Sequence, residues 1–135
     1  TRSKTRVSVL GPTLTTDPYT IAALGHAASQ IDMARNQMLR TIDEMYAIAR
    51  SGAKIPKALR SRARRDQAVE SKMALDALDD VFGRIGASAV HLTDPVQRVW
   101  RDAHTAQHHA MNSIDRPLFS WTHHAMGLGT TDIIV

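Results

Sequence analysis

The sequence predicts an all-α protein built as an antiparallel four-helix bundle, with two long helices and two shorter ones. Four segments, 18–51, 56–85, 95–111 and 117–126, repeat apolar side chains at steps of three and four residues, the period of an α-helix. Glycine and proline separate these segments, and no stretch alternates as a half-buried strand does. A length of 135 residues is typical of one domain, so residues 1–135 are predicted to form a single helical unit.

The first predicted helix covers residues 18–51. Asp17 can cap it, and Pro18 can occupy the first helical position, where its missing N–H costs nothing. Gly52 follows the last turn and suits the left-handed conformation in which many helices end. The apolar side chains with helical period are Ile21, Leu24, Ala28, Ile31, Ala34, Met38, Ile42, Met45 and Ala49. A helix of this length in a small domain is typical of a bundle.

The second predicted helix covers residues 56–85, and Gly83 and Gly86 mark its end. Its apolar stripe consists of Ala58, Leu59, Ala63, Val69, Met73, Leu75, Leu78, Val81 and Phe82. The residues that follow, 86–89, are all small, so a backbone or a ligand can approach this turn closely.

The third predicted helix, 95–111, begins with Asp94 as the cap and Pro95 at the first helical position. Its apolar face would be formed by Val96, Val99, Ala103, Ala106 and Ala110. A fourth, short helix follows at 117–126. Residues 127–135 form a tail with an apolar tip, which suggests docking on another surface.

The composition excludes several classes of protein. No cysteine is present, so disulfides, thiolate nucleophiles and cysteine-bound metals are excluded. The sequence contains no run of about 18 apolar residues, so a membrane span is not expected. The first four residues, 1–4, are not followed by the apolar segment of a signal peptide, so a cytoplasmic protein is expected. The net charge of +4 makes phosphate, nucleic acid or an anionic cofactor a reasonable partner.

Two clusters of polar residues allow alternative functions. His104 and His108 share a helix face, and His123 and His124 follow on the next helix, but few carboxylates lie nearby, so we do not expect a metal site. The basic run 57–65 has no interleaved aromatic residues, so a solvated face or a subunit contact is favoured over nucleic-acid binding. A basic helical interaction module that is not an enzyme remains an alternative.

A longer pattern resembles the C-terminal helical domain of the acyl-CoA dehydrogenase superfamily. That domain carries a Gly-Gly turn followed by Pro-x-x-Arg-x-x-Arg-Asp-Ala. Here Gly86-Ala87-Ser88-Ala89 precedes Pro95-Val96-Gln97-Arg98-Val99-Trp100-Arg101-Asp102-Ala103, with Ala87 in place of the second glycine. Segments 31–35 and 60–66 also fit the order of elements. The resemblance implies that residues 1–10 end a truncated first helix, and that the N-terminal helical domain and the middle β-barrel domain lie outside this sequence.

Two branches of the superfamily differ at the end of this pattern. In acyl-CoA dehydrogenases a catalytic glutamate, followed by Gly-Thr, often lies after the Arg-Asp-Ala segment. This chain has Ala110 at the matching position. The stretch Arg101 to His109 is similar instead to the two-component flavin-dependent monooxygenases, in which the matching histidine faces the flavin and the substrate. An imidazole there can hydrogen-bond the flavin or accept a phenol proton near neutral pH. His109 is therefore the predicted catalytic residue.

The resemblance also implies cofactors and partners. The expected enzyme would hydroxylate an aromatic or heteroaromatic substrate with O₂ and reduced flavin, FMN or FAD, supplied by a separate reductase. Gly86, Ala87, Ser88, Arg98 and Arg101 are the predicted flavin-binding residues, in a homotetramer that binds flavin between subunits. This fragment alone should be inactive. The alternative within the superfamily is an acyl-CoA dehydrogenase whose base comes from elsewhere.

Overall fold

The computed structural model describes residues 17–129, with only the backbone of Ser88. Its helices are α1 (Pro18–Arg50), α2 (Lys57–Ile85), α3 (Pro95–Gln107) and α4 (Asp115–Ala125), joined by the short 3₁₀ turns η1 (Ala87–Val90) and η2 (Ala110–Asn112). Within residues 17–129 there is no strand, so the all-α class with two long and two shorter helices is confirmed. The predictions for segment 1–10 and for the tip of the tail, 130–135, lie outside the described residues.

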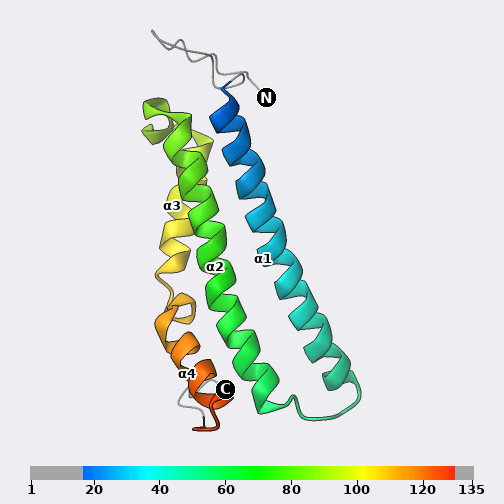
Figure 1. Ribbon diagram of the computed structural model, residues 1–135. Helices are drawn as coiled ribbons and strands as arrows, with labels where there is room; N and C mark the ends of the chain where they lie inside the picture. Colours follow the sequence, from blue (N-terminus) through cyan, green and yellow to red (C-terminus); the bar gives the residue numbers. More distant parts are fainter. Residues whose placement is uncertain (1–16, 130–135) are drawn as a thin grey trace.

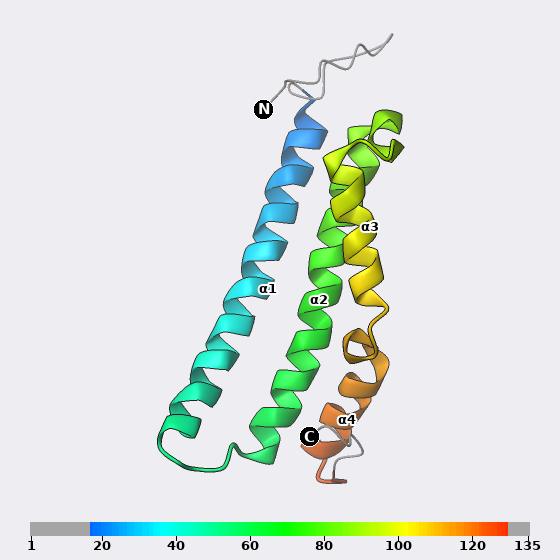
Figure 2. The same ribbon diagram turned by 180° about the vertical axis from the view of Figure 1, so that it is seen from behind.

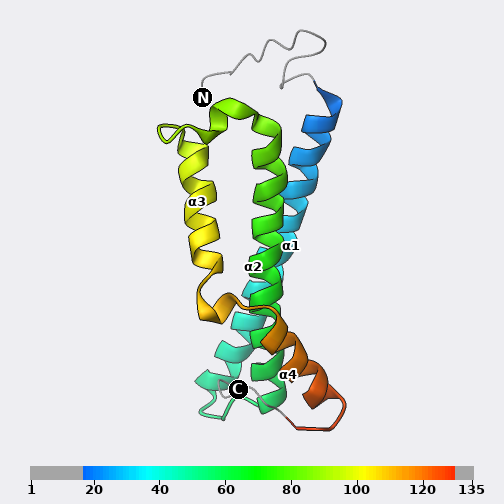
Figure 3. The same ribbon diagram turned by 90° about the vertical axis from the view of Figure 1, so that its left-hand side faces the viewer.

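The long helix α2 is the centre of the arrangement. Figures 1 and 2 show α1 running antiparallel to α2 on one side, with α3 and α4 on the other. Figure 3 shows α3 beside one half of α2 and α4 beside the other half, so both shorter helices run back along the same partner. Within the described residues α1 packs against α2 and has no comparable contact with α3 or α4.

The interface between α1 and α2 is made by small residues. Ala23, Ala27, Ala34 and Thr41 are the buried residues of α1. The larger side chains of the predicted stripe lie beside this interface and stay half exposed: Ile21 is 52%, Leu24 50%, Ile31 46%, Met38 44% and Ile42 50% exposed. Of the apolar positions with helical period, Ala34 alone is among the buried residues of α1. The helices meet along alanines, which allow a close approach.

The predicted helix starts are confirmed by capping hydrogen bonds. A carboxylate oxygen of Asp17 accepts from the Thr20 N–H at 2.9 Å, and one of Asp94 accepts from the Val96 N–H at 2.9 Å. These side chains satisfy N–H groups that have no partner within the first turn of a helix. Gly52 follows α1 with φ 77°, as expected.

The third helix ends earlier than predicted, at Gln107 instead of residue 111. His108 is its C-terminal cap, and His109 has an extended backbone with φ −64° and ψ 137°. The predicted apolar face is only partly correct, because Val96 and Ala103 are half-buried whereas Val99 is 56% exposed and Ala106 is exposed. The half-buried face of α3 is formed by Val96, Gln97, Trp100, Ala103, His104 and Gln107.

The fourth helix begins at Asp115, two residues before the predicted start. Pro117 lies in its first turn, where the missing N–H breaks no helical hydrogen bond, so the proline does not set the boundary.

Candidate functional site

The turn between α3 and α4 presents the predicted catalytic residue. His109 caps η2, and its Nδ1 atom accepts a hydrogen bond from the Met111 N–H at 3.2 Å. A neutral imidazole that accepts through Nδ1 carries its proton on Nε2. The side chain is exposed. In this geometry His109 can donate a hydrogen bond from Nε2 to a group that approaches the turn.

The turn is held against α2 by a buried arginine. Arg64 is 7% exposed, and its guanidinium donates to the carbonyl oxygen of Met111. Gln107 donates to the carbonyl oxygen of Asn112 at 3.0 Å, and the Asn112 amide donates to the carbonyl oxygen of Ala106 at 2.8 Å. These bonds fix the backbone on both sides of His109. The acceptors of these bonds are backbone carbonyls, which leave no signal in the sequence. The sequence therefore showed Arg64 only as part of the basic run 57–65 and gave no role to Asn112.

A second cluster fastens α3 to α2. One carboxylate oxygen of Asp79 accepts hydrogen bonds from Trp100 Nε1 at 2.6 Å and from His104 Nε2 at 2.7 Å. Trp100 stacks on Phe82 with ring centroids 4.8 Å apart, and the His104 ring lies 4.2 Å from the Trp100 ring. His104 is therefore part of the packing between α2 and α3.

The predicted flavin-binding residues lie in the turn at Gly86 that precedes α3 and, for Arg98 and Arg101, in the first two turns of α3. Gly86 has φ 89°, a conformation that favours glycine, and its carbonyl oxygen accepts from the Ala89 N–H at 2.9 Å. Ala87 is exposed, and the Ser88 side chain is outside the description. Arg98 and Arg101 are exposed and pair with Asp102 at 3.5 and 3.8 Å.

The structure does not bring the Gly86 turn and His109 together in one chain. They flank the 13 residues of α3, a helix about 20 Å long. Figure 3 shows the two turns at opposite ends of α3.

The basic run 57–65 makes contacts within the fold that the prediction of a solvated face did not include. Arg62 pairs with Glu44 of α1, while Arg65 pairs with Asp66 and lies 4.1 Å from the centre of the Trp121 ring of α4. Because Arg64 is buried as well, the prediction of a solvated face is wrong for this residue. The run helps to join α2 to α1, to α4 and to the His109 turn.

The remaining histidines do not assemble a metal centre within residues 17–129, where no three His, Cys, Asp or Glu side chains gather around a common point. His123 stacks on Phe119 at 5.4 Å, and its Nδ1 lies 3.3 Å from the carbonyl oxygen of Gly129. In the same part of the chain, no helix has both the length and the apolar character to cross a membrane.

The helical fold and the Pro-x-x-Arg-x-x-Arg-Asp-Ala pattern at 95–103 are features of a known protein family. Residues 1–114 match the family described as "Acyl-CoA dehydrogenase, C-terminal domain". The chain belongs to this family.

More particular similarity is found among hydroxylases. The chain is 35% identical over 132 residues to the flavin-dependent monooxygenase oxygenase subunit HsaA of Mycobacterium tuberculosis, a match that covers 98% of the chain and 34% of that protein. It is 36% identical to a pigment production hydroxylase of Rhodococcus erythropolis, over 79% of the chain and 27% of the relative. The chain thus spans about a third of the length of the curated HsaA relatives it matches.

Solved structures of hydroxylases and related proteins share the fold of this chain. The 3-HSA hydroxylase from Rhodococcus sp. RHA1 has a TM-score of 0.85 at 35% identity, covering 90% of this chain and 32% of that one. XiaF from Streptomyces sp., in complex with FADH2 and glycerol, has a TM-score of 0.86 at 26% identity, covering 94% and 33%.

Proposed function

We propose that this chain is the C-terminal domain of the oxygenase component of a two-component, reduced-flavin-dependent monooxygenase. The whole enzyme would hydroxylate an aromatic or heteroaromatic substrate with O₂. The observation that carries this proposal is the turn after α3, where His109 is exposed and the following residue is Ala110. A dehydrogenase that removes a proton from a thioester needs a base, and the carboxylate expected at this position is missing.

The flavin, when bound, would supply the two electrons that allow O₂ to give one oxygen atom to the ring and one to water. The role of His109 is to donate a hydrogen bond from Nε2 to the reacting oxygen or to the phenol oxygen of the substrate. Preorganised donors of this kind stabilise charge that develops during a reaction. The Met111 N–H at Nδ1 keeps the imidazole in the tautomer that can donate.

For the cofactor we propose FAD. The glycine turn at Gly86 and Ala87 has a backbone that a phosphate or an adenosine can approach closely. FMN lacks the adenosine and pyrophosphate that this turn would contact. Arg98 and Arg101 at the exposed face of α3 would add positive charge.

A homotetramer would complete the site. The two ends of α3 are about 20 Å apart, so the Gly86 turn would contact the flavin of a neighbouring subunit while His109 contacts its own. The remaining domains of the same polypeptide would supply the rest of the pocket, and a separate reductase would supply the reduced flavin. A cytoplasmic location goes with these proposals.

The experiment uses the full-length protein. Supplied with FADH₂ and O₂, it should hydroxylate phenolic substrates from a panel, and it should not transfer electrons from acyl-CoA thioesters to bound FAD. Reduction of the bound FAD by a thioester, with no hydroxylated product, would replace the proposal with a dehydrogenase whose base lies elsewhere.

A further inference from the structure

The third helix ends earlier than its own sequence requires. Its last residue is Gln107, and the backbone of His109 is already extended, with φ −64° and ψ 137°. The next residues, Ala110 and Met111, both have a high helix propensity, and no glycine or proline lies between Gln107 and Pro117. Local propensity therefore does not end α3, and the cause has to lie in hydrogen bonds that compete with those of a longer helix.

The carbonyl of Ala106 is the acceptor that a longer helix would need. In a continuing α-helix it would accept a hydrogen bond from the N–H of Ala110, four residues further along the chain. In this structure it accepts instead from the side-chain amide of Asn112 at 2.8 Å and from the N–H of His109 at 3.1 Å. A carbonyl oxygen has two lone pairs, so both are occupied and none is left for Ala110.

Asn112 also closes the turn around His109 through its backbone. Its N–H donates to the carbonyl oxygen of His109 at 2.8 Å, and its own carbonyl oxygen accepts from the Gln107 side chain at 3.0 Å. This closed turn brings the N–H of Met111 to 3.2 Å from Nδ1 of His109. In a longer helix the same N–H would bond to the carbonyl of Gln107 and would no longer be available to the imidazole.

We propose that Asn112 is a positioning residue for His109, because its side-chain amide ends α3 and thereby keeps the N–H of Met111 at the imidazole. Without this amide the carbonyl of Ala106 is free to accept from Ala110, and the helix can extend through the turn. His109 would then lie on the surface of a helix, and no N–H would favour the tautomer that carries its proton on Nε2. The effect on the turn is independent of the proposed function, whereas the effect on hydroxylation rests on it.

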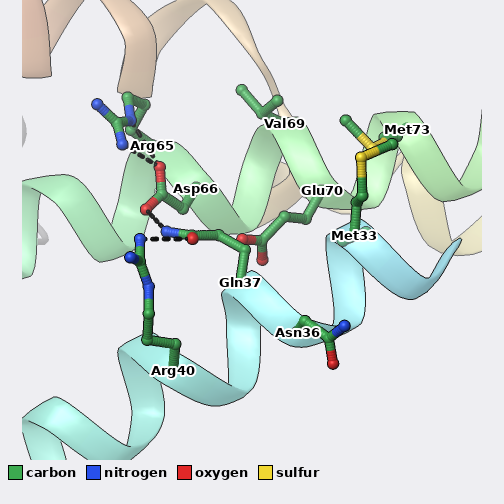
Figure 4. Close-up of a pocket in the computed structure, with 10 residues that line it drawn as sticks. Met33, Asn36, Gln37, Arg40, Arg65, Asp66, Val69, Glu70 and Met73 are labelled. Atoms are coloured by element: carbon green, nitrogen blue, oxygen red, sulfur yellow. Dashed lines mark hydrogen bonds and ion pairs between the residues drawn. The ribbon is translucent and has the colours of Figure 1, made fainter. Parts of the chain in front are cut away.

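The test compares variants of the full-length protein that undergo the same chemical change. Asn112→Asp keeps the size of the side chain but removes the donor to the carbonyl of Ala106. Asn36→Asp is the control, because Asn36 is exposed on α1 and Figure 4 shows no bond from it to the other side chains drawn. A further variant, Asn112→Ala, removes the donor without adding a charge.

The first measurement is the tautomer of His109, followed by ¹⁵N NMR of histidine-labelled protein at alkaline pH, with the signal assigned by its loss in His109→Ala. Wild type and Asn36→Asp should show one tautomer, with the proton on Nε2, whereas both Asn112 variants should show a mixture. A single tautomer with the proton on Nε2 in both Asn112 variants would overturn the proposal, whatever their activity.

The second measurement is the hydroxylated product formed per FADH₂ oxidised. Both Asn112 variants should lower it by about tenfold or more, because a displaced catalytic group loses the geometry that the reaction needs. In a His109→Ala background the same changes should cause no further loss, since Asn112 acts only through His109. A further loss there would show a general structural role of Asn112 and would overturn the proposal. Full hydroxylation by His109→Ala, together with the tautomer change in the Asn112 variants, would refute the proposed function and support the positioning of the ring by Asn112.

Discussion

The buried guanidinium of Arg64 donates a hydrogen bond to the backbone carbonyl of Met111, two residues after His109. This bond links the middle of the basic run on α2 to the turn that carries the proposed catalytic residue. Its removal would free the turn and leave the carbonyl of the half-buried Met111 without this donor.

We expect Arg64→Gln to lower the free energy of unfolding by about 2–4 kcal/mol, because it removes a buried charged donor from the described fold. In the full-length enzyme it should also lower the yield of hydroxylated product, since His109 would lose its fixed position. Arg60→Gln, at an exposed position of the same run, is the control for charge alone. Urea unfolding and product yield measure the two effects, and equal behaviour of both variants would contradict the role of Arg64.

The contact of Asp79 with Trp100 and His104 predicts an energetic coupling between α2 and α3. Asp79→Ala should destabilise the protein by about 1–2 kcal/mol, because two hydrogen bonds are lost at a half-exposed site. A double-mutant cycle with His104→Ala should give a coupling energy of about 1 kcal/mol. A coupling energy of zero would show that this hydrogen bond is not formed in solution.

Two glycines that are close in sequence should respond oppositely to alanine. Gly83 lies inside α2 with open space around the position of a Cβ, so Gly83→Ala should stabilise the protein by about 0.5–1 kcal/mol. Gly86 has φ 89°, so Gly86→Ala should destabilise by about 1 kcal/mol or more. If the turn also holds the adenosine end of FAD, Gly86→Ala should weaken FAD binding more than FMN binding, which a fluorescence titration would detect.

The cap of α1 predicts a dependence of stability on pH. Hydrogen bonds from the Thr20 hydroxyl, and secondly from its N–H, lower the pKa of Asp17 from the ordinary 3.8. The unfolded chain therefore binds more protons here, so the contribution of Asp17 is fully present above the ordinary pKa and is lost as the pH falls through the lowered value. In urea unfolding from pH 6 to pH 2, Asp17→Asn should lose less stability than the wild type. An identical loss would contradict the lowered pKa.

Helix starts could be predicted from the sequence because a capping aspartate before a proline, at 17–18 and 94–95, is a local signal. The buried face of each helix could not be predicted in this way. The stripe with Ile21 and Leu24 has the correct period, but α2 meets α1 at Ala23 and Ala27, and periodicity does not say which partner covers which face. The end of α3 was missed because Ala110 and Met111 are good helix formers, whereas a tertiary hydrogen bond from Arg64 and a local one from Asn112 fix a turn there.

The candidate site was predicted only in part. The resemblance singled out His109 as a candidate, but not its place outside the helix or the Met111 N–H at its ring. The burial of Glu70, which is 9% exposed, could not be predicted, because in the sequence it is like any other polar residue between apolar positions of a helix. Its burial depends on how closely α1 approaches α2, which no local pattern contains.

In the proposed function, His109 donates a hydrogen bond during oxygen transfer. The most direct measurement is the amount of hydroxylated product formed per FADH₂ oxidised by the full-length enzyme, for wild type, His109→Ala and, as the neighbouring control, His108→Ala. We predict that His109→Ala lowers the rate of hydroxylation by about 10²-fold or more while FADH₂ is still oxidised, and that His108→Ala changes it little. Unchanged hydroxylation by His109→Ala would contradict this role of His109.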